Sequence, residues 1–204
     1  AEINLVMRQE GLPAAEVLKN KFDLPFVVSA PYGYAATLAW LEEVGKILGQ
    51  LPDVKMCARL RLKAQNTASL KMYAMMMGRK KTPQAAVIGE YDLVKGLSAF
   101  LRSVGIDVKY KLCSHSLKSI VEPELDIQYI SVEKEKIDIL KKMQKTLVLA
   151  DDVSHRLWDS SNAVLRVSAP FIDGAQIATH LPLLGEKGTD FLLETIEAYY
   201  QTLA

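Results

Sequence analysis

The sequence predicts an α/β fold in which short buried strands alternate with amphipathic helices. Between residues 85 and 167, five short apolar runs are separated by segments with helical periodicity, and a similar strand–helix pattern opens the chain. Strands that alternate with helices in this way are typical of parallel sheets. We therefore expect a Rossmann-like parallel-sheet unit at about 80–175, preceded by the tail of another α/β unit and followed by a C-terminal helix.

The first 52 residues contain two predicted strands and two predicted helices. Residues 3–7 and 24–29 form apolar runs, and a helix is predicted between them at 12–21. A second helix follows the break at residues 31–34 and has its apolar residues on one face: Leu38, Leu41, Val44 and Leu48. Two strands are too few to close a sheet, so we interpret residues 1–52 as the end of a preceding Rossmann-like domain.

The rest of the chain is predicted to form a linker and one domain. Residues 53–82 are assigned to a long connecting helix and linker, and residues 83–204 to a Rossmann-like domain with a C-terminal helix. Thr189 is expected to begin that last helix, because threonine is a favoured N-cap. The predicted strands of the domain lie at residues 85–88, 106–110, 125–129, 146–149 and 164–167. We expect these five strands to form one parallel sheet and the two earlier strands to form a separate, smaller sheet.

Composition excludes several classes of function. Lys plus Arg is 25 and Asp plus Glu is 24, so the net charge of +1 predicts neither a nucleic-acid nor a membrane partner. No apolar run of about 20 residues and no signal peptide is present. Because the chain opens with Ala and enters a strand at once, we expect it to be part of a longer protein.

The two cysteines are too few and too far apart for most cysteine-based sites. Cys57 and Cys113 form no CxxC pair, which argues against a disulfide scaffold and a zinc finger. Their number fits a protein of the reducing cytoplasm. An iron–sulfur cluster usually takes four thiolates, so we predict no metal site and no cofactor within this chain alone.

Candidate binding residues follow the predicted strands, because open parallel sheets bind ligands at the carboxyl ends of their strands. The corresponding loops are residues 30–34, 89–92, 113–116, 151–155 and 168–171. From these loops we select as candidate cofactor-binding residues Gly33, Tyr34, Gly89, Tyr91, His115, Asp151 and Ser168. We expect the loop at 31–34 to face the Gly89 and His115 loops across one shared pocket.

Each candidate also has a purely structural interpretation. A glycine after a strand often only permits a tight turn, and an acidic residue at a helix start stabilises the helix dipole. The GxGxxG, Walker A, nucleophile-elbow and HExxH motifs are absent, so no catalytic residue is assigned. From the residues alone, the chain is an α/β ligand-binding domain.

Three stretches resemble the nitrogenase component 1 family. AEINLVMRQEGLPAAEVLKNKFDLPFVVSAPYGYAATLAWLEEVGKILG resembles a strand, helix, strand and small-residue loop of that family, followed by a helix that ends in Leu-Gly. AAVIGEYDLVKGLSAFLRSVGIDV resembles the opening of its third Rossmann-like domain. NAVLRVSAPFIDGAQIATHLPLLGEKGTDFLLETI resembles its late strand and C-terminal helix. The stretches occur in family order, so the chain resembles the C-terminal portion of such a protein.

The resemblance implies an oxidoreductase. The family includes the nitrogenase molybdenum–iron protein α and β subunits, cofactor-scaffold proteins and dark-operative protochlorophyllide reductase relatives. It implies a full-length protein that takes part in ATP-coupled electron transfer or nitrogenase-type cofactor assembly. The implied partners are a P-loop ATPase iron–sulfur reductase and a homologous component 1 subunit. An iron–sulfur cluster, or a metallocluster or tetrapyrrole, is then expected in the full-length complex, and the isolated fragment is expected to be inactive.

Departures from the family pattern indicate which kind of subunit the chain resembles. Arg8 stands where the catalytic α-type subunit has a cofactor-ligating Cys, and Ser168 falls near its late ligating His. Asp92 replaces an Arg in a cofactor-facing loop whose glycine matches Gly89. The resemblance therefore favours a β-like, scaffold-like or uncharacterised relative over a dinitrogen-reducing α subunit. The alternative, from another class, is a non-catalytic metal-chelate or cofactor-carrier binding module.

Overall fold

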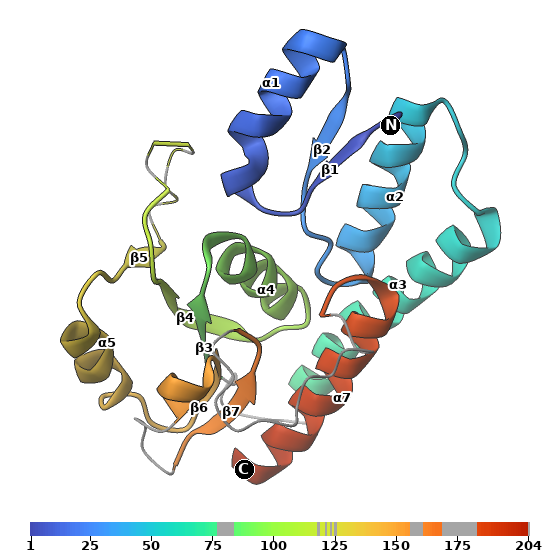
Figure 1. Cartoon of the computed structure of the whole chain (residues 1–204). Helices are drawn as coiled ribbons and strands as arrows, with labels where there is room; N and C mark the ends of the chain where they lie inside the picture. Colours follow the sequence, from blue (N-terminus) through green and yellow to red (C-terminus); the bar gives the residue numbers. More distant parts are fainter. Residues whose placement is uncertain are drawn as a thin grey trace.

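The computed structural model describes residues 1–76, 84–117, 119–120, 122, 124, 126–155, 161–168 and 183–203. Within these residues the strands form a two-stranded sheet of order β1-β2 and a five-stranded sheet of order β5-β4-β3-β6-β7 (Figure 1). All strand pairs are parallel. The predicted α/β class and the division of the strands between two sheets are confirmed. The domain boundaries at residues 52 and 82 stay a prediction.

The first unit consists of the small sheet and three α-helices. Its elements are β1 (Asn4–Val6), the 3-10 helix η1 (Gln9–Gly11), α1 (Leu12–Phe22), β2 (Phe26–Val28), α2 (Tyr34–Leu48) and α3 (Val54–Met76). The backbone turns into α2 at Gly33, whose φ is +88°. A Cβ atom at Gly33 would lie 2.8 Å from the ring of Phe100, so both the turn and the close packing require glycine.

The second unit consists of the large sheet and its helices. Its elements are β3 (Gln84–Gly89), α4 (Tyr91–Ser103), β4 (Asp107–Cys113), β5 (Gln128–Tyr129), α5 (Glu133–Leu140), β6 (Thr146–Ala150), α6 (Asp152–His155), β7 (Ala163–Arg166) and α7 (Gly185–Leu203). β3 lies at the centre, between β4 and β6. Every residue of β6 and all of β3 except Gln84 are buried. Continuous apolar runs such as these are typical of parallel strands that are covered on both faces.

Alternate residues of the central strands pack into two separate cores. On one face, Val87 and Leu147 pack with Leu97 and Leu101 of α4 and with Leu192 of α7. On the other face, buried residues of β3 and β6 pack with the α5 region: Ala86, Ile88, Leu140, Met143 and Val148. The sheet is therefore the middle layer of a three-layer unit, and its strand ends remain free at the edge.

Several element boundaries differ from the sequence prediction, and the largest differences are at β5 and α7. The strand predicted at 125–129 is only two residues long in the described structure, and Leu125 lies outside the described residues. The prediction that Thr189 begins the last helix was wrong, because α7 begins at Gly185. Gly185 supports the turn with a φ of +72°. The hydroxyl of Thr189 instead donates to the Gly185 carbonyl at 2.7 Å, a bond that threonine makes inside helices.

None of the helices in the described part of the chain is long and apolar enough to cross a lipid bilayer.

Candidate functional site

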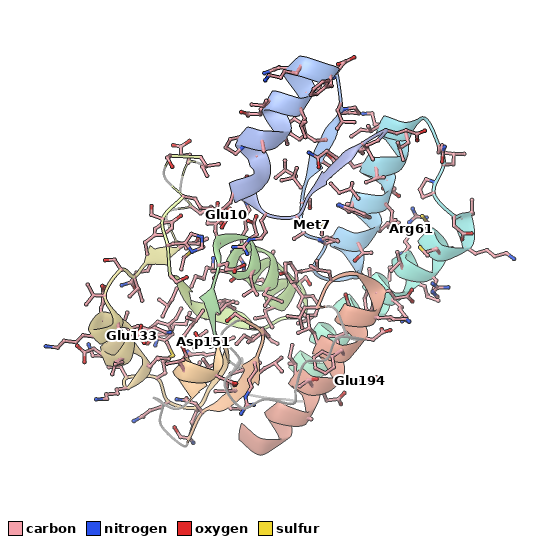
Figure 2. All side chains as sticks on the ribbon, in the orientation of Figure 1. Met7, Glu10, Arg61, Glu133, Asp151 and Glu194 are labelled. Atoms are coloured by element: carbon pink, nitrogen blue, oxygen red, sulfur yellow. The ribbon has the colours of Figure 1, made fainter. Side chains whose placement is uncertain are left out.

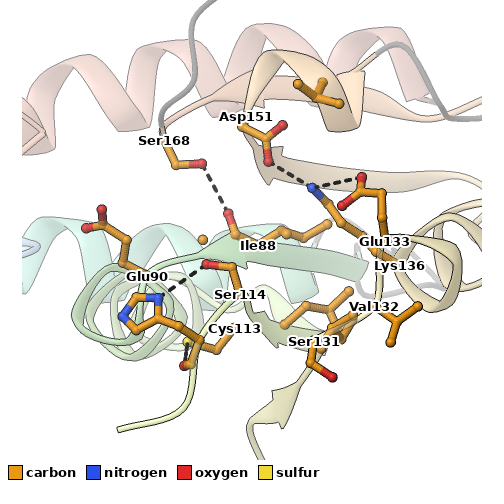
Figure 3. A pocket seen from close by; sticks show the side chains of 15 residues that line it. Ile88, Glu90, Cys113, Ser114, Ser131, Val132, Glu133, Lys136, Asp151 and Ser168 are labelled. Atoms are coloured by element: carbon orange, nitrogen blue, oxygen red, sulfur yellow. Dashed lines mark hydrogen bonds and ion pairs between the residues drawn. The ribbon is translucent and has the colours of Figure 1, made fainter.

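A cavity of about 490 Å³ lies at the carboxyl edge of the large sheet (Figure 3). Its apolar lining includes Ile88, Leu112 and Ile130, which lie at or next to the ends of β3, β4 and β5. Its polar lining comes from the loops after β3, β4, β6 and β7 and from the start of α5. This volume lies within the usual range for small-molecule sites.

The structure brings four of the seven candidate residues into this cavity: Gly89, His115, Asp151 and Ser168. The Ser168 hydroxyl donates to the Ile88 carbonyl at 3.3 Å, which holds the loop after β7 against the end of β3. A Cβ atom at Gly89 would lie 3.4 Å from the Cβ of Ser168 and 3.1 Å from the Leu93 side chain. Gly89 therefore lets the two strand ends approach each other, and residues 169–171 of that predicted loop lie outside the described residues.

The other three candidates lie elsewhere. Gly33 packs against Phe100, and Tyr91 is 1% exposed within the core beneath α4. The Tyr34 hydroxyl donates to the Asp190 carboxylate, and its ring lies 5.2 Å from the Lys63 ammonium. None of these three residues lines the cavity, and the loop at 31–34 does not contribute to it. That loop packs on α4 instead.

One end of the cavity is formed by Asp151 and Lys136. The Asp151 carboxylate accepts hydrogen bonds from the Ser154 backbone N–H at 2.8 Å and the Ser154 hydroxyl at 2.9 Å. Lys136 Nζ lies 3.2 Å from Asp151 Oδ2 and 3.8 Å from Glu133 Oε1. The N-terminal turn of α6 thus fixes Asp151 in place, and Asp151 holds the Lys136 ammonium beside the strand ends. No sequence pattern distinguishes Lys136 from Lys134 of the same helix.

The first unit reaches the cavity rim through the residues that follow β1. Arg8 Nη1 lies 2.9 Å from Glu90 Oε1, and Gln9 donates its backbone N–H to Asp92 Oδ2 at 2.7 Å. Figure 2 shows the next residue, Glu10, at the end of the first unit that faces the large sheet. The segment 8–10 therefore binds Glu90, between β3 and α4, and the first turn of α4, where the sequence had led us to expect the loop at 31–34.

Glu10 also binds His115 at the rim. His115 Nε2 lies 2.8 Å from Glu10 Oε1, and its Nδ1 lies 3.4 Å from the Ser114 hydroxyl. When His115 is neutral and donates from Nε2, Nδ1 is left to accept a hydrogen bond from the Ser114 side. The pair joins residues that are 105 positions apart, so no local pattern could have indicated it.

Burial and charge shift the pKa values of several groups at this edge. Burial raises the pKa of Glu10, but hydrogen bonds from Arg8, the backbone and His115 outweigh it and lower that pKa to about 2. Burial raises the pKa of the Asp92 carboxyl despite the opposing hydrogen bond from Gln9. It also raises the pKa of the Cys113 thiol, whose Sγ lies 3.1 Å from the His115 carbonyl oxygen. Cys113 is therefore a poor source of thiolate.

The chain is similar to known proteins along almost its whole length. A family model described as Nitrogenase component 1 type Oxidoreductase matches residues 1–200. The chain is 27% identical over 206 residues to the nitrogenase iron-iron protein beta chain of Rhodobacter capsulatus. This match covers 93% of this chain and 43% of that protein.

A solved structure supports the same fold. In a structure described as Nitrogenase Cp1 at pH 6.5, one chain superposes with a TM-score of 0.69 and 16% identity, over 97% of this chain and 45% of that chain. At this identity the similarity shows the fold alone. The chain spans less than half the length of both relatives.

Proposed function

Because the chain belongs to the nitrogenase component 1 type oxidoreductase family, we propose that it is a region of a subunit that acts in ATP-coupled electron transfer or in nitrogenase-type cofactor assembly. In this proposal the full-length protein works with a P-loop ATPase iron–sulfur reductase and a homologous component 1 subunit. The cavity at the ends of β3, β4, β6 and β7 carries the proposal, because it lies where open parallel sheets bind their ligands.

The residues of this chain would bind and orient a ligand. The strand ends at Ile88 and Leu112 exclude water from the apolar side of the cavity. The hydroxyls of Ser114 and Ser131 and the ammonium of Lys136 line the polar side and offer hydrogen bonds. Glu10 holds the His115 ring at the rim.

The residues present do not fit a metallocluster. Cys57 lies on α3 and Cys113 on β4, and both are buried and free. In the described part of the chain, no three His, Cys, Asp or Glu side chains are grouped to hold a metal ion. The guanidinium of Arg8 is taken up by Glu10 and Glu90, and Ser168 presents a hydroxyl. We therefore propose a β-like, scaffold-like or uncharacterised relative in preference to a dinitrogen-reducing α subunit.

Reconstitution tests this proposal. The full-length protein is combined with its homologous subunit, the reduced reductase and ATP, and complex formation and reductase oxidation are measured. We expect a stable complex and oxidation that depends on ATP. Ser131→Trp, which places a large ring in the cavity, should lower the rate about ten-fold or more. Ser103→Trp, an exposed substitution at the end of α4, serves as the matched control and should leave the rate unchanged.

Two results would contradict the proposal. One is a full-length protein that neither binds the reductase nor oxidises it. The other is saturable binding of a metal chelate such as haem by the chain alone, unaffected by the reductase, which would favour the carrier module instead.

A further inference from the structure

Two side chains that line the cavity also hold the first unit in place. Glu90 and His115 both belong to the cavity lining. Glu90 Oε1 lies 2.9 Å from Arg8 Nη1, and His115 Nε2 lies 2.8 Å from Glu10 Oε1. Segment 8–10 therefore occupies the polar groups that Glu90 and His115 would offer to a ligand.

The contacts of segment 8–10 with the second unit are polar and shallow. Besides the two ion pairs, the backbone N–H of Gln9 donates to Asp92 Oδ2 at 2.7 Å. η1 buries none of its residues, and the side chains of Glu90 and His115 are 42% and 40% exposed. Exposed charged groups contribute less to a contact than close packing does.

The first unit is also held on α4 by contacts that are packed and not ionic. A Cβ atom at Gly96 would lie 2.1 Å from the Tyr32 ring, and one at Gly33 would lie 2.8 Å from the Phe100 ring. Each ring therefore rests directly on a glycine of the other unit. Phe100 lies about 15 Å along α4 from its N-cap Glu90, so the packed contacts and the polar contacts are at different places on the helix.

We infer that segment 8–10 is a latch, which releases the cavity rim while the packed contacts at Tyr32 and Gly33 hold. In the latched state Glu90 and His115 bind the first unit, and in the released state they are free to bind a ligand. A ligand that binds either side chain therefore opens the latch, and a closed latch weakens the binding of that ligand to the same degree. The inference rests on the proposed function only in that it takes this cavity as the ligand site.

Two backbone N–H groups report on the two kinds of contact. The Gln9 N–H donates to Asp92 at the latch, and the Gly185 N–H donates to the Pro31 carbonyl at 3.0 Å beside the packed contacts. Amide hydrogen exchange of the whole chain, followed by NMR, gives the protection of each group. Local opening exposes only the amides of the part that opens, so the two groups should respond differently when the latch is weakened.

Arg8→Gln weakens the latch, because it removes the ion pairs with Glu90 and Glu10. It should lower the protection of Gln9 about five-fold, the effect expected for the loss of exposed ion pairs. The protection of Gly185 should stay unchanged, because the packed contacts remain.

The ring of His115 gives a second readout in the same samples. Arg8→Gln should shift the ring nitrogen signals of His115, because release of the segment takes the Glu10 carboxylate away from the ring. Arg61→Gln is the matched control, since Arg61 forms an exposed ion pair with Glu42 on the other side of the first unit. It should leave both amides and the His115 signals unchanged.

Three results would overturn the inference. In Arg8→Gln these are an equal loss of protection at Gln9 and Gly185, unchanged protection of Gln9, and unchanged ring signals of His115. None of these measurements involves the reductase or ATP, so failure of the latch and failure of the proposed function are distinguishable.

Discussion

The two sheets of this chain differ in how completely their strands are covered. All five residues of β6 are buried in the large sheet, whereas β1 buries Val6 and β2 buries Val27 in the small one. Leu5 of β1 is 42% exposed and Phe22 of α1 is 72% exposed. The large sheet thus carries its own core on two faces, whereas each strand of the small sheet buries only one of its three residues.

Two charged contacts join the two units. At the rim, Arg8 bridges Glu90 and Glu10, and Glu10 in turn binds His115. Between α3 and α7, Arg59 binds both carboxylate oxygens of Glu186 at 2.7 and 2.8 Å, and Lys63 bridges Glu186 and Asp190. Both contacts are networks, and networks of charges stabilise more than isolated surface pairs do.

The largest effect is expected when the same residue type is truncated in each sheet. Leu149→Ala, at a fully buried position of β6, should lower the free energy of unfolding by about 2–5 kcal/mol. Leu5→Ala, at its half-exposed position, should lower it by less than about 1 kcal/mol. Urea denaturation of the whole chain measures both. Equal losses would show that the two sheets are equally well packed.

The junction at Gly33 should give the next largest effect. Gly33→Ala places a methyl group 2.8 Å from the Phe100 ring at a residue with a φ of +88°, and overpacking of this kind costs about 1–3 kcal/mol. Gly49→Ala is the control, because Gly49 also has a positive φ but a Cβ atom there meets nothing within 4 Å. Thermal unfolding of the two variants measures the combined cost of the clash and of the backbone at Gly33, whose ψ of 160° is less accessible to alanine than the left-handed helical conformation of Gly49. If both variants lose the same stability, α2 does not depend on its contact with α4.

The helix contact should respond more than an isolated surface pair. Glu186→Gln removes the charge that Arg59 and Lys63 share and should cost about 1 kcal/mol. Glu42→Gln, which breaks the exposed pair with Arg61, should cost about 0.5 kcal/mol or less. Hydrogen exchange of α7 amides adds a local readout, with faster exchange expected in Glu186→Gln alone. Equal costs and unchanged exchange would remove the distinction between network and pair.

The smallest expected effect is a change in how the stability depends on acidic pH, caused by Glu10 at the rim and Glu186 between α3 and α7. Glu10 and Glu186 have pKa values of about 2 against an ordinary value of 4.5. Between these values the unfolded chain binds more protons than the folded chain, so stability should fall as the pH falls from about 4.5 to about 2. Glu10→Gln and Glu186→Gln together should flatten this slope, as measured by urea midpoints across the range. A slope unchanged by both substitutions would contradict the lowered pKa values.

The sequence predicted the features of the fold and the site that depend on local residue patterns. Apolar runs such as Leu147–Leu149 locate buried strands, and the resemblance to the component 1 family is confirmed by the match over residues 1–200. The rule that loops meet at strand ends brought Gly89, His115, Asp151 and Ser168 together. Tyr34 also follows a strand, but its strand belongs to the other sheet, and that rule does not extend from one sheet to another.

The remaining site residues depend on contacts that leave no local signal. Glu10 reaches His115 across 105 positions, and its place is fixed by how the two units dock. Lys136 is one of several lysines in its segment, and only the path of α5 past Asp151 distinguishes it. Thr189 was misplaced because threonine caps helices but also bonds inside them.

The position of α7 has a consequence for how the chain is made. α7 supplies Leu192 and Ile196 to one face of the large sheet, and Gly185 at its start donates its backbone N–H to the Pro31 carbonyl at 3.0 Å. During translation every strand of the sheet leaves the ribosome before α7 does. The nascent sheet therefore exposes part of its apolar face until the last helix emerges, and during that interval a chaperone would find its binding surface there.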